Sequence, residues 1–156
     1  MTSRTLFRYF SAAVVFAAVV LYPGCSTGQQ QAIELSQNGP TVVNARAEPG
    51  VIVLNRDLLP NRPAEVLADV KDFKSNILDV RLKFQDVPME VPMQNIGGTT
   101  WRAELTPQQL QQLAISGQTV KYAATVVARN TKGETTTSPE PIYVAVRTPD
   151  LAAQYG

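Results

Sequence analysis

Cys25 is the single cysteine of this 156-residue chain and the side chain best suited to covalent chemistry. A thiol is a good nucleophile and can accept a lipid through a thioether bond. Histidine is absent, which removes the usual general base, the commonest metal ligand, and the Ser-His-Asp and Cys-His arrangements of hydrolases. Glycine-rich phosphate-binding loops are also missing. We therefore expect a protein that is not an enzyme and needs no cofactor.

Three aspartates lie near one another in the sequence, at Asp69, Asp72 and Asp79. Carboxylates are ligands that calcium prefers, but this spacing matches no calcium-binding loop, and Lys71 and Lys74 alternate with the aspartates. We interpret the three carboxylates as solvated strand residues and predict no metal site.

The composition sets further limits. Hydrophobic residues make up 44% of the chain, enough for a packed core, while charged residues make up only 17%. The net charge is +1, and two of the cations, Arg4 and Arg8, precede an apolar run at the start of the chain. The remainder is therefore close to neutral and has no basic footprint for nucleic acid.

Residues 1–24 have the layout of a secretory signal peptide. The positive residues are followed by a stretch from Phe10 to Leu21 that contains no charge and is rich in Ala, Val and Phe. A helix needs roughly 20 apolar residues to cross the hydrocarbon layer, and this run is shorter. Pro23 and Gly24 would end any helix there.

The end of this segment resembles the lipobox of bacterial lipoproteins, because Gly24 and Cys25 match its two most demanding positions. Tyr22 and Pro23 depart from the usual leucine and small residue. The resemblance implies cleavage between Gly24 and Cys25, lipidation of Cys25 with palmitate-type acyl chains, and a place in the bacterial cell envelope. Ser26 is not the aspartate that favours retention in the inner membrane. We therefore expect the outer membrane, facing the periplasm, rather than the inner membrane or the cell surface.

One alternative is that the apolar segment stays uncut and anchors the protein as an N-terminal membrane helix. In either case residues 25–39, rich in Gln, Ser and Gly, form a flexible linker. A flexible chain of this length spans roughly 20 Å.

From Thr41 onward the apolar residues recur with a period of two, which indicates β-strands. The clearest strand covers residues 77–84, where we expect one face to point into a core and the other into water. Its inward residues would be Leu78, Val80, Leu82 and Phe84. Further strands are expected at residues 41–47, 51–55, 64–70, 99–105, 120–129 and 141–147. Trp101 belongs to the inward face of its strand.

A short helix is predicted between the strands that contain Trp101 and Tyr122. Thr106 can cap it, Pro107 suits its first turn, and Gln109 completes a capping box. Gly117 can end the helix.

About seven short strands in residues 40–148, separated by turn signals, predict a single all-β domain folded as a sandwich of two sheets. This stretch resembles the immunoglobulin-like and fibronectin type III-like modules of bacterial envelope proteins. The resemblance is carried by the strand around Val80, by TTWRAEL, by the crossover helix, and by VKYAATVVARNTKGE. It implies an antiparallel sandwich in which the Tyr122 hydroxyl bonds to the crossover backbone as a tyrosine corner. Residues 149–156 form a C-terminal tail.

The segment VPMEVPM, residues 87–93, contains two prolines and cannot be a central strand. We favour an edge strand protected by proline. The other interpretation is an apolar strip presented to a partner protein. That strip would consist of Val87, Met89, Val91, Met93 and Ile96.

Tyr143 alternates with Ile142 and Val144 and is therefore expected to face solvent. The function that we expect is that of a lipid-anchored interaction or scaffold module, such as an accessory component of an envelope assembly. Its partners would be the membrane and an envelope protein. A second interpretation is a carbohydrate- or peptidoglycan-binding module, or the accessory subunit of an envelope enzyme, with exposed aromatics recognising a sugar chain.

Overall fold

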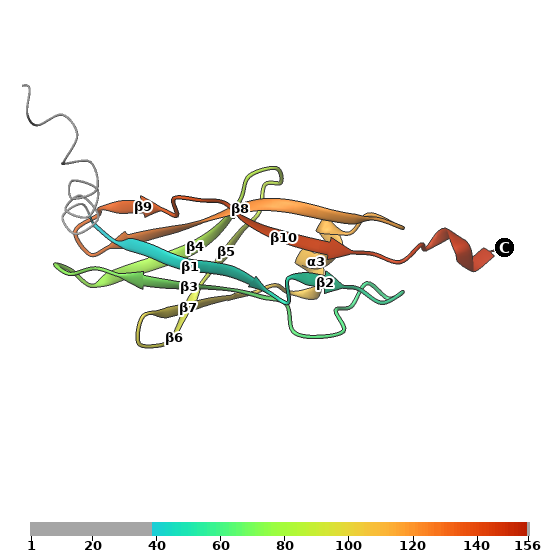
Figure 1. The fold of residues 1–156 in the computed structure, drawn as a ribbon, viewed down its shortest axis with the longest axis horizontal. Helices are drawn as coiled ribbons and strands as arrows, with labels where there is room; N and C mark the ends of the chain where they lie inside the picture. Colours follow the sequence, from blue (N-terminus) through green and yellow to red (C-terminus); the bar gives the residue numbers. More distant parts are fainter. Residues whose placement is uncertain (1–38, 156) are drawn as a thin grey trace, which may run out of the picture. The chain divides into compact units, whose positions relative to one another are not determined.

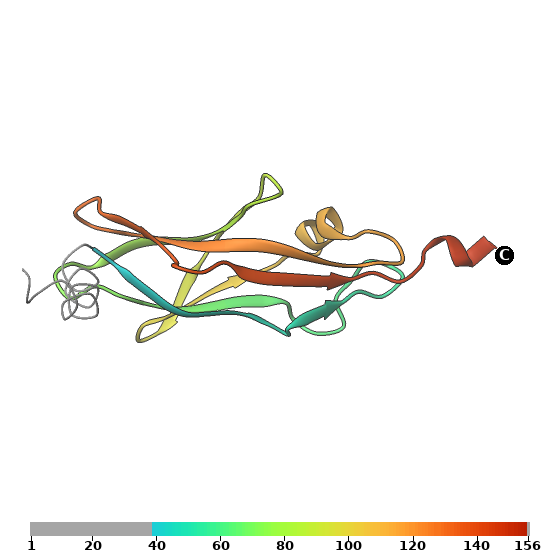
Figure 2. The same cartoon turned by 45° about the horizontal axis from the view of Figure 1, so that its top comes forward.

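The computed structural model describes residues 39–155, which form a β-sandwich of two sheets (Figures 1 and 2). The four-stranded sheet has the order β1 (Thr41–Glu48), β3 (Glu65–Lys71), β7 (Thr100–Glu104) and β6 (Gln94–Gly97). The six-stranded sheet has the order β2 (Val51–Val53), β10 (Ile142–Arg147), β8 (Thr119–Asn130), β4 (Ile77–Phe84) and β5 (Glu90–Pro92), and β9 (Thr135–Thr137) also pairs with β8. The predicted all-β sandwich is confirmed.

The described residues contain ten strands where about seven were expected. The three strands beyond those seven, β5, β6 and β9, have only three or four residues each, and of these β5 lies in the segment 87–93, where an edge strand was favoured. Such short segments do not produce an alternation that can be recognised in the sequence. The sandwich is also not entirely antiparallel, because β2 runs parallel to β10. The chain passes from one sheet to the other between β1 and β2.

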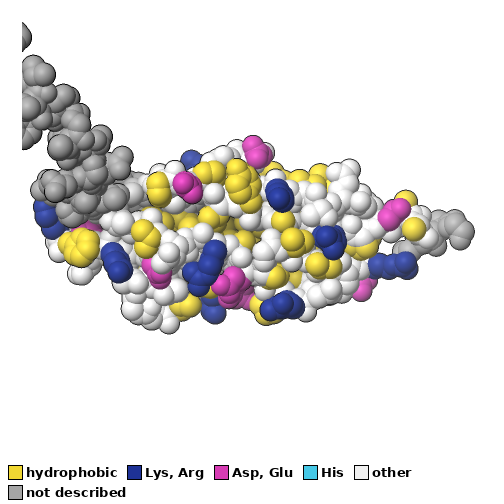
Figure 3. All heavy atoms as spheres, in the orientation of Figure 1, with side chains coloured by type: hydrophobic (Ala, Val, Ile, Leu, Met, Phe, Trp, Pro, Cys, Tyr) yellow, Lys and Arg dark blue, Asp and Glu magenta, His cyan; other side chains and the backbone are white. Residues whose placement is uncertain are grey.

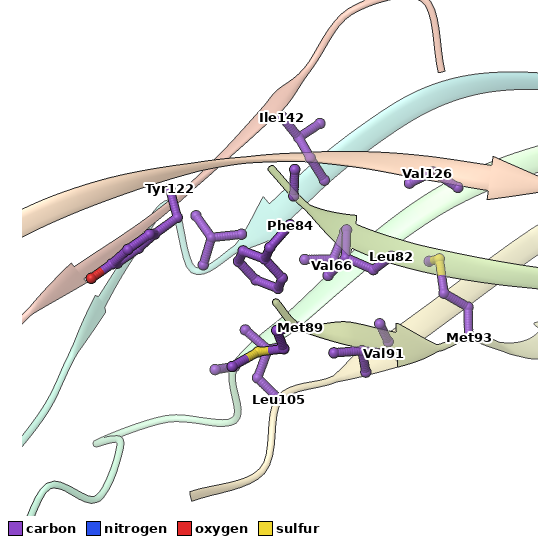
Figure 4. Close-up of a cluster of buried hydrophobic side chains, with 14 of the residues drawn as sticks. Val66, Leu82, Phe84, Met89, Val91, Met93, Leu105, Tyr122, Val126 and Ile142 are labelled. Atoms are coloured by element: carbon purple, nitrogen blue, oxygen red, sulfur yellow. The ribbon is translucent and has the colours of Figure 1, made fainter. Parts of the chain in front are cut away.

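The core lies between the sheets and contains the inward residues that alternation predicts. Figure 4 shows side chains from both sheets meeting there. Leu78 is an exception: it was expected to point inward but is 54% exposed. A bulge separates Ile77 from Asp79 in the pairing of β4 with β8, and Ile77 packs against the core instead. The extra residue in a bulge reverses the side-chain alternation at that point.

The short helix α3 (Pro107–Leu113) has the predicted N-terminus. The Gln109 amide donates to the Thr106 hydroxyl and the Thr106 amide donates to the Gln109 side chain, as a capping box requires. The helix buries Leu110 and Leu113 completely. The helix ends at Leu113 with Ala114 as an extended C-cap, so the prediction that Gly117 ends it is wrong. Gly117 lies in the following turn with a φ of +71°.

The sandwich has two distinct ends. At one end the chain enters β1, and the β3–β4 connection and the β8–β9 turn lie beside it; we call this the linker end (Figure 1). The opposite end, the helix end, contains α3 and the C-terminal segment with the 3-10 helix η1 (Ala152–Tyr155). There the Gly117 amide donates to the Pro149 carbonyl and the Leu151 amide to the Ser116 hydroxyl. Within residues 39–155, no helix has the length and apolar character needed to cross a membrane.

Candidate functional site

The apolar strip predicted in the segment 87–93 is not a surface feature. Met89, Val91 and Met93 are only 7%, 4% and 5% exposed and belong to the core, Val87 is half-buried, and Ile96 alone is largely exposed. The prediction of a partner-binding strip is therefore wrong. Alternate residues of β5 face inward here, and the chain then crosses to β6 at the edge of the other sheet. The favoured interpretation is confirmed, because β5 is an edge strand and ends at Pro92.

Trp101 and Tyr122 have the structural positions that were predicted for them. Trp101 is partly buried and packs against the core. The Tyr122 hydroxyl donates to the Leu113 carbonyl oxygen over 2.7 Å, which ties β8 to the end of α3 as a tyrosine corner. Burial raises the pKa of the Tyr122 hydroxyl above 10.0, so it remains a donor at neutral pH.

Tyr143 faces solvent, as predicted, with 57% of its surface exposed. It lies on the outer face of the six-stranded sheet, where its neighbours are small or apolar. Across the strand pairs, Ala123 is opposite Tyr143, and Val51 and Lys121 flank Ala145. We call this surface the Tyr143 face and define its apolar part as Tyr143, Ala123, Val51 and Val53; Ala145 belongs to the same strand face but is only 3% exposed.

Cations surround the apolar part of the Tyr143 face. Lys121 pairs with Ala145, Arg147 lies beside Val53, and Lys83 projects from β4 on the same side of the sheet. All three are exposed, and in the described part of the chain no carboxylate lies within ion-pair distance of them. An exposed aromatic ring among unpaired cations suits a partner that presents acidic groups.

The remaining charges on this face neutralise one another. Asp79 accepts from Arg129 over 2.6 Å and lies 3.6 Å from Arg81, which also approaches Glu90 at 3.5 Å. Together with Lys83, Val127 and Thr135 these residues line a shallow depression of about 240 Å³. The ion-paired residues therefore give the depression a polar surface but little net charge.

The outer face of the four-stranded sheet differs, because several of its charges are paired within the sheet. Arg46 pairs with Glu48 at 2.7 Å and Arg102 with Glu65 at 3.8 Å. Hydrogen bonds from Asn44 and Thr100 hold the pKa of Asp69 below 3.8. The Tyr143 face thus combines an exposed aromatic ring with cations that have no ion pair among the described residues. Figure 3 shows the mixture of charged and apolar side chains on one side of the domain.

Gly24 and Cys25 lie outside the described residues, so the predicted lipidation site stays a prediction. In residues 39–155, no group of three or more potential metal ligands is close enough to hold an ion. Asp72 takes part in hydrogen bonds instead, accepting from Asn130 at 2.8 Å and from the Lys74 and Ser75 amides.

Sequence reasoning found Tyr143 but missed the cations around it. Lys83, Lys121 and Arg147 come from three strands, and only the strand order places them on one surface. Each of these cations alternates with inward apolar residues, which shows that it lies on an outer face. The alternation does not show which strands lie next to each other on that face. Comparison with known proteins gives no further assignment: no protein family matches the chain, and no curated protein is significantly similar to it.

Proposed function

We propose that the protein is a lipid-anchored, non-catalytic component of a bacterial cell envelope whose sandwich domain binds a partner protein through the Tyr143 face. The anchor is Cys25, which follows a positive segment and an apolar run that is too short to span a bilayer. Two or three acyl chains on this residue would hold the protein stably at the membrane. The proposed place is the outer membrane, with the domain in the periplasm.

The observation that carries the binding role is the composition of the Tyr143 face. Tyrosine and arginine are enriched in protein interfaces, and the rest of this face offers small side chains against which a partner can pack closely. The unpaired Lys83, Lys121 and Arg147 favour a partner with carboxylates around an apolar centre. An accessory role in an envelope assembly fits a small domain with this kind of surface.

Site-specific cross-linking in living cells tests this role. A photoreactive residue at position 143 should capture one defined protein, whereas the same residue at Ile96, exposed on the edge of the other sheet, should not. Combining the probe with Lys83→Glu and Lys121→Glu should reduce capture about tenfold or more, because these changes bring like charges together. Capture that is equal at the two positions, or that persists after charge reversal, would contradict the proposal.

Binding of a sugar chain is the alternative, and the exposed Tyr143 ring on the same outer face as the shallow depression favours it. Aromatic rings stack on sugars while planar carboxylate and guanidinium groups bind their hydroxyls. Sedimentation with purified peptidoglycan distinguishes the two functions. If Tyr143→Ala abolishes such binding while no protein is captured in cells, the sugar-binding function replaces the protein-binding one.

A further inference from the structure

The linker end presents an aromatic side chain to solvent. Phe73, in the β3–β4 connection, is 76% exposed, more than any other large hydrophobic side chain among the described residues. Leu78, at the nearby bulge of β4, is 54% exposed. A single exposed apolar side chain is common on a protein surface, so the significance of Phe73 depends on what else lies at the linker end.

The loop that carries Phe73 is firmly held. Asp72 accepts hydrogen bonds from the amides of Lys74 and Ser75 at 2.8 and 3.0 Å, and from the Asn130 side chain at 2.8 Å. Asn130 is fully buried, and its other side-chain atom accepts from two amides of the β8–β9 turn. The exposure of Phe73 is therefore a consequence of a fixed backbone.

Exposed lysines lie at the same end of the domain, together with Glu134 of the β8–β9 turn. Lys71, Lys74 and Lys132 are exposed at this end, the first two next to Phe73 in the sequence and the third in the β8–β9 turn. The Asp72 carboxylate is occupied by its hydrogen bonds, which outweigh the effect of burial and lower its pKa, so it remains ionised but shielded. Figure 3 shows hydrophobic and basic side chains close together at this end of the domain. An aromatic ring among lysines suits the headgroup region of an anionic bilayer.

The described part of the chain begins at the same end. A Cβ placed on Gly39, the first described residue, would lie 3.0 Å from the Cβ of Glu134 in the β8–β9 turn. Cys25 precedes Gly39 by 14 residues, and a flexible chain of that length spans roughly 20 Å. The twelve residues of β8 extend over about 40 Å. A lipid on Cys25 would therefore keep the linker end close to the bilayer, while the helix end can lie much farther away.

We propose that the linker end rests on the lipid surface, with Phe73 inserted between headgroups and Lys71, Lys74 and Lys132 facing lipid phosphates. This inference rests on the lipid anchor of the proposed function. It orients the domain, because the strands then lead away from the bilayer and the Tyr143 face remains open to a partner beside it.

Quenching by brominated lipids tests the contact in the full-length, acylated protein reconstituted in vesicles. In a Trp101→Phe background, Phe73→Trp introduces a single tryptophan at the linker end, and Ile115→Trp introduces one at the helix end, where Ile115 is 44% exposed. In vesicles of phosphatidylcholine and phosphatidylglycerol, the tryptophan at position 73 should be strongly quenched and emit at shorter wavelength. The tryptophan at position 115 should behave as it does in water.

The lysines are tested in the same system. Replacing Lys71, Lys74 and Lys132 by Gln should reduce quenching at position 73 in anionic vesicles to the level found with phosphatidylcholine alone. Each lysine should contribute about fivefold to the equilibrium constant for docking on the anionic surface at low salt. Equal quenching at positions 73 and 115 in protein that sediments with the vesicles would overturn the docking while leaving the anchor intact. Failure of the wild-type protein to sediment would overturn the anchor, and the docking with it.

Discussion

The two ends of the sandwich differ in which side chains they bury. At the helix end Leu110 and Leu113 are fully buried, and the Tyr122 hydroxyl has a hydrogen-bond partner. At the linker end the polar Asn130 is fully buried and binds Asp72 and the β8–β9 turn, while Phe73 lies in solvent. The helix end is thus closed by its own hydrophobic contacts. The linker end is held together by hydrogen bonds, which leaves its aromatic ring available for contact outside the domain.

The largest difference should appear when one apolar side chain is removed from each end. Leu110→Ala should lower the free energy of unfolding by about 3 kcal/mol, because it leaves a cavity under α3. Phe73→Ala should change it by less than about 0.5 kcal/mol. Urea unfolding of the detergent-solubilised protein, followed by circular dichroism, measures both. Similar losses for the two variants would show that Phe73 supports the fold and would remove the contrast.

Asn130→Ala should have the next largest effect, lowering the free energy of unfolding by about 2 kcal/mol. It leaves the Asp72 carboxylate without a side-chain donor and the amides of Lys132 and Glu134 without an acceptor. The matched control is Asn76→Ala, because Asn76 is exposed and contributes its backbone carbonyl to this region. If both variants have the stability of the wild type in the same unfolding experiment, hydrogen bonds do not hold the linker end.

Tyr122→Phe should cost about 1 kcal/mol, since it removes one buried hydrogen bond without changing the shape of the ring. Tyr143→Phe serves as the control, because the Tyr143 ring is exposed and its loss of a hydroxyl should be neutral. Thermal unfolding of the two variants gives the comparison. A neutral Tyr122→Phe would mean that the tyrosine corner does not stabilise the helix end.

The smallest effect concerns pH. Burial opposes ionisation of Asp72, but the hydrogen bonds from Asn130 and two amides prevail and set its pKa below 3.8. A carboxyl whose pKa is lowered by folding stabilises the native state above its unfolded pKa, and this contribution disappears as pH falls through the folded pKa. The urea midpoint should therefore be steady near neutral pH and fall below about pH 4. Asp72→Asn should make that fall shallower, whereas Asp86→Asn, at an exposed site, should leave it unchanged.

Much of the fold could be predicted because the alternation of apolar residues reports directly on burial. Val80, Leu82, Tyr122 and Val126 face the core as their period requires. Leu78 could not be placed correctly, because a bulge shifts the alternation by one residue and leaves no signature in this sequence. The apolar residues of β5 show that alternation alone does not determine burial. Alternation identifies Met89 and its neighbours as one face, but only the packing of two sheets decides that this face is internal.

The candidate surfaces were less predictable, because they depend on contacts between distant segments. Tyr143 could be assigned to an outer face from its own strand alone. The cations near it are assembled by the order of β10, β8 and β4, which local sequence does not determine. Phe73 lies in a connection without periodicity, where burial cannot be deduced from spacing. Its significance depends on the position of Gly39 beside Glu134 at the same end.

Mass spectrometry of the mature protein tests the central claim, the lipid anchor on Cys25, most directly. The account predicts that residues 1–24 are absent and that the chain begins at Cys25 with a diacylglycerol thioether on its sulfur. A chain that retains residues 1–24 and carries a free thiol at Cys25 would contradict it.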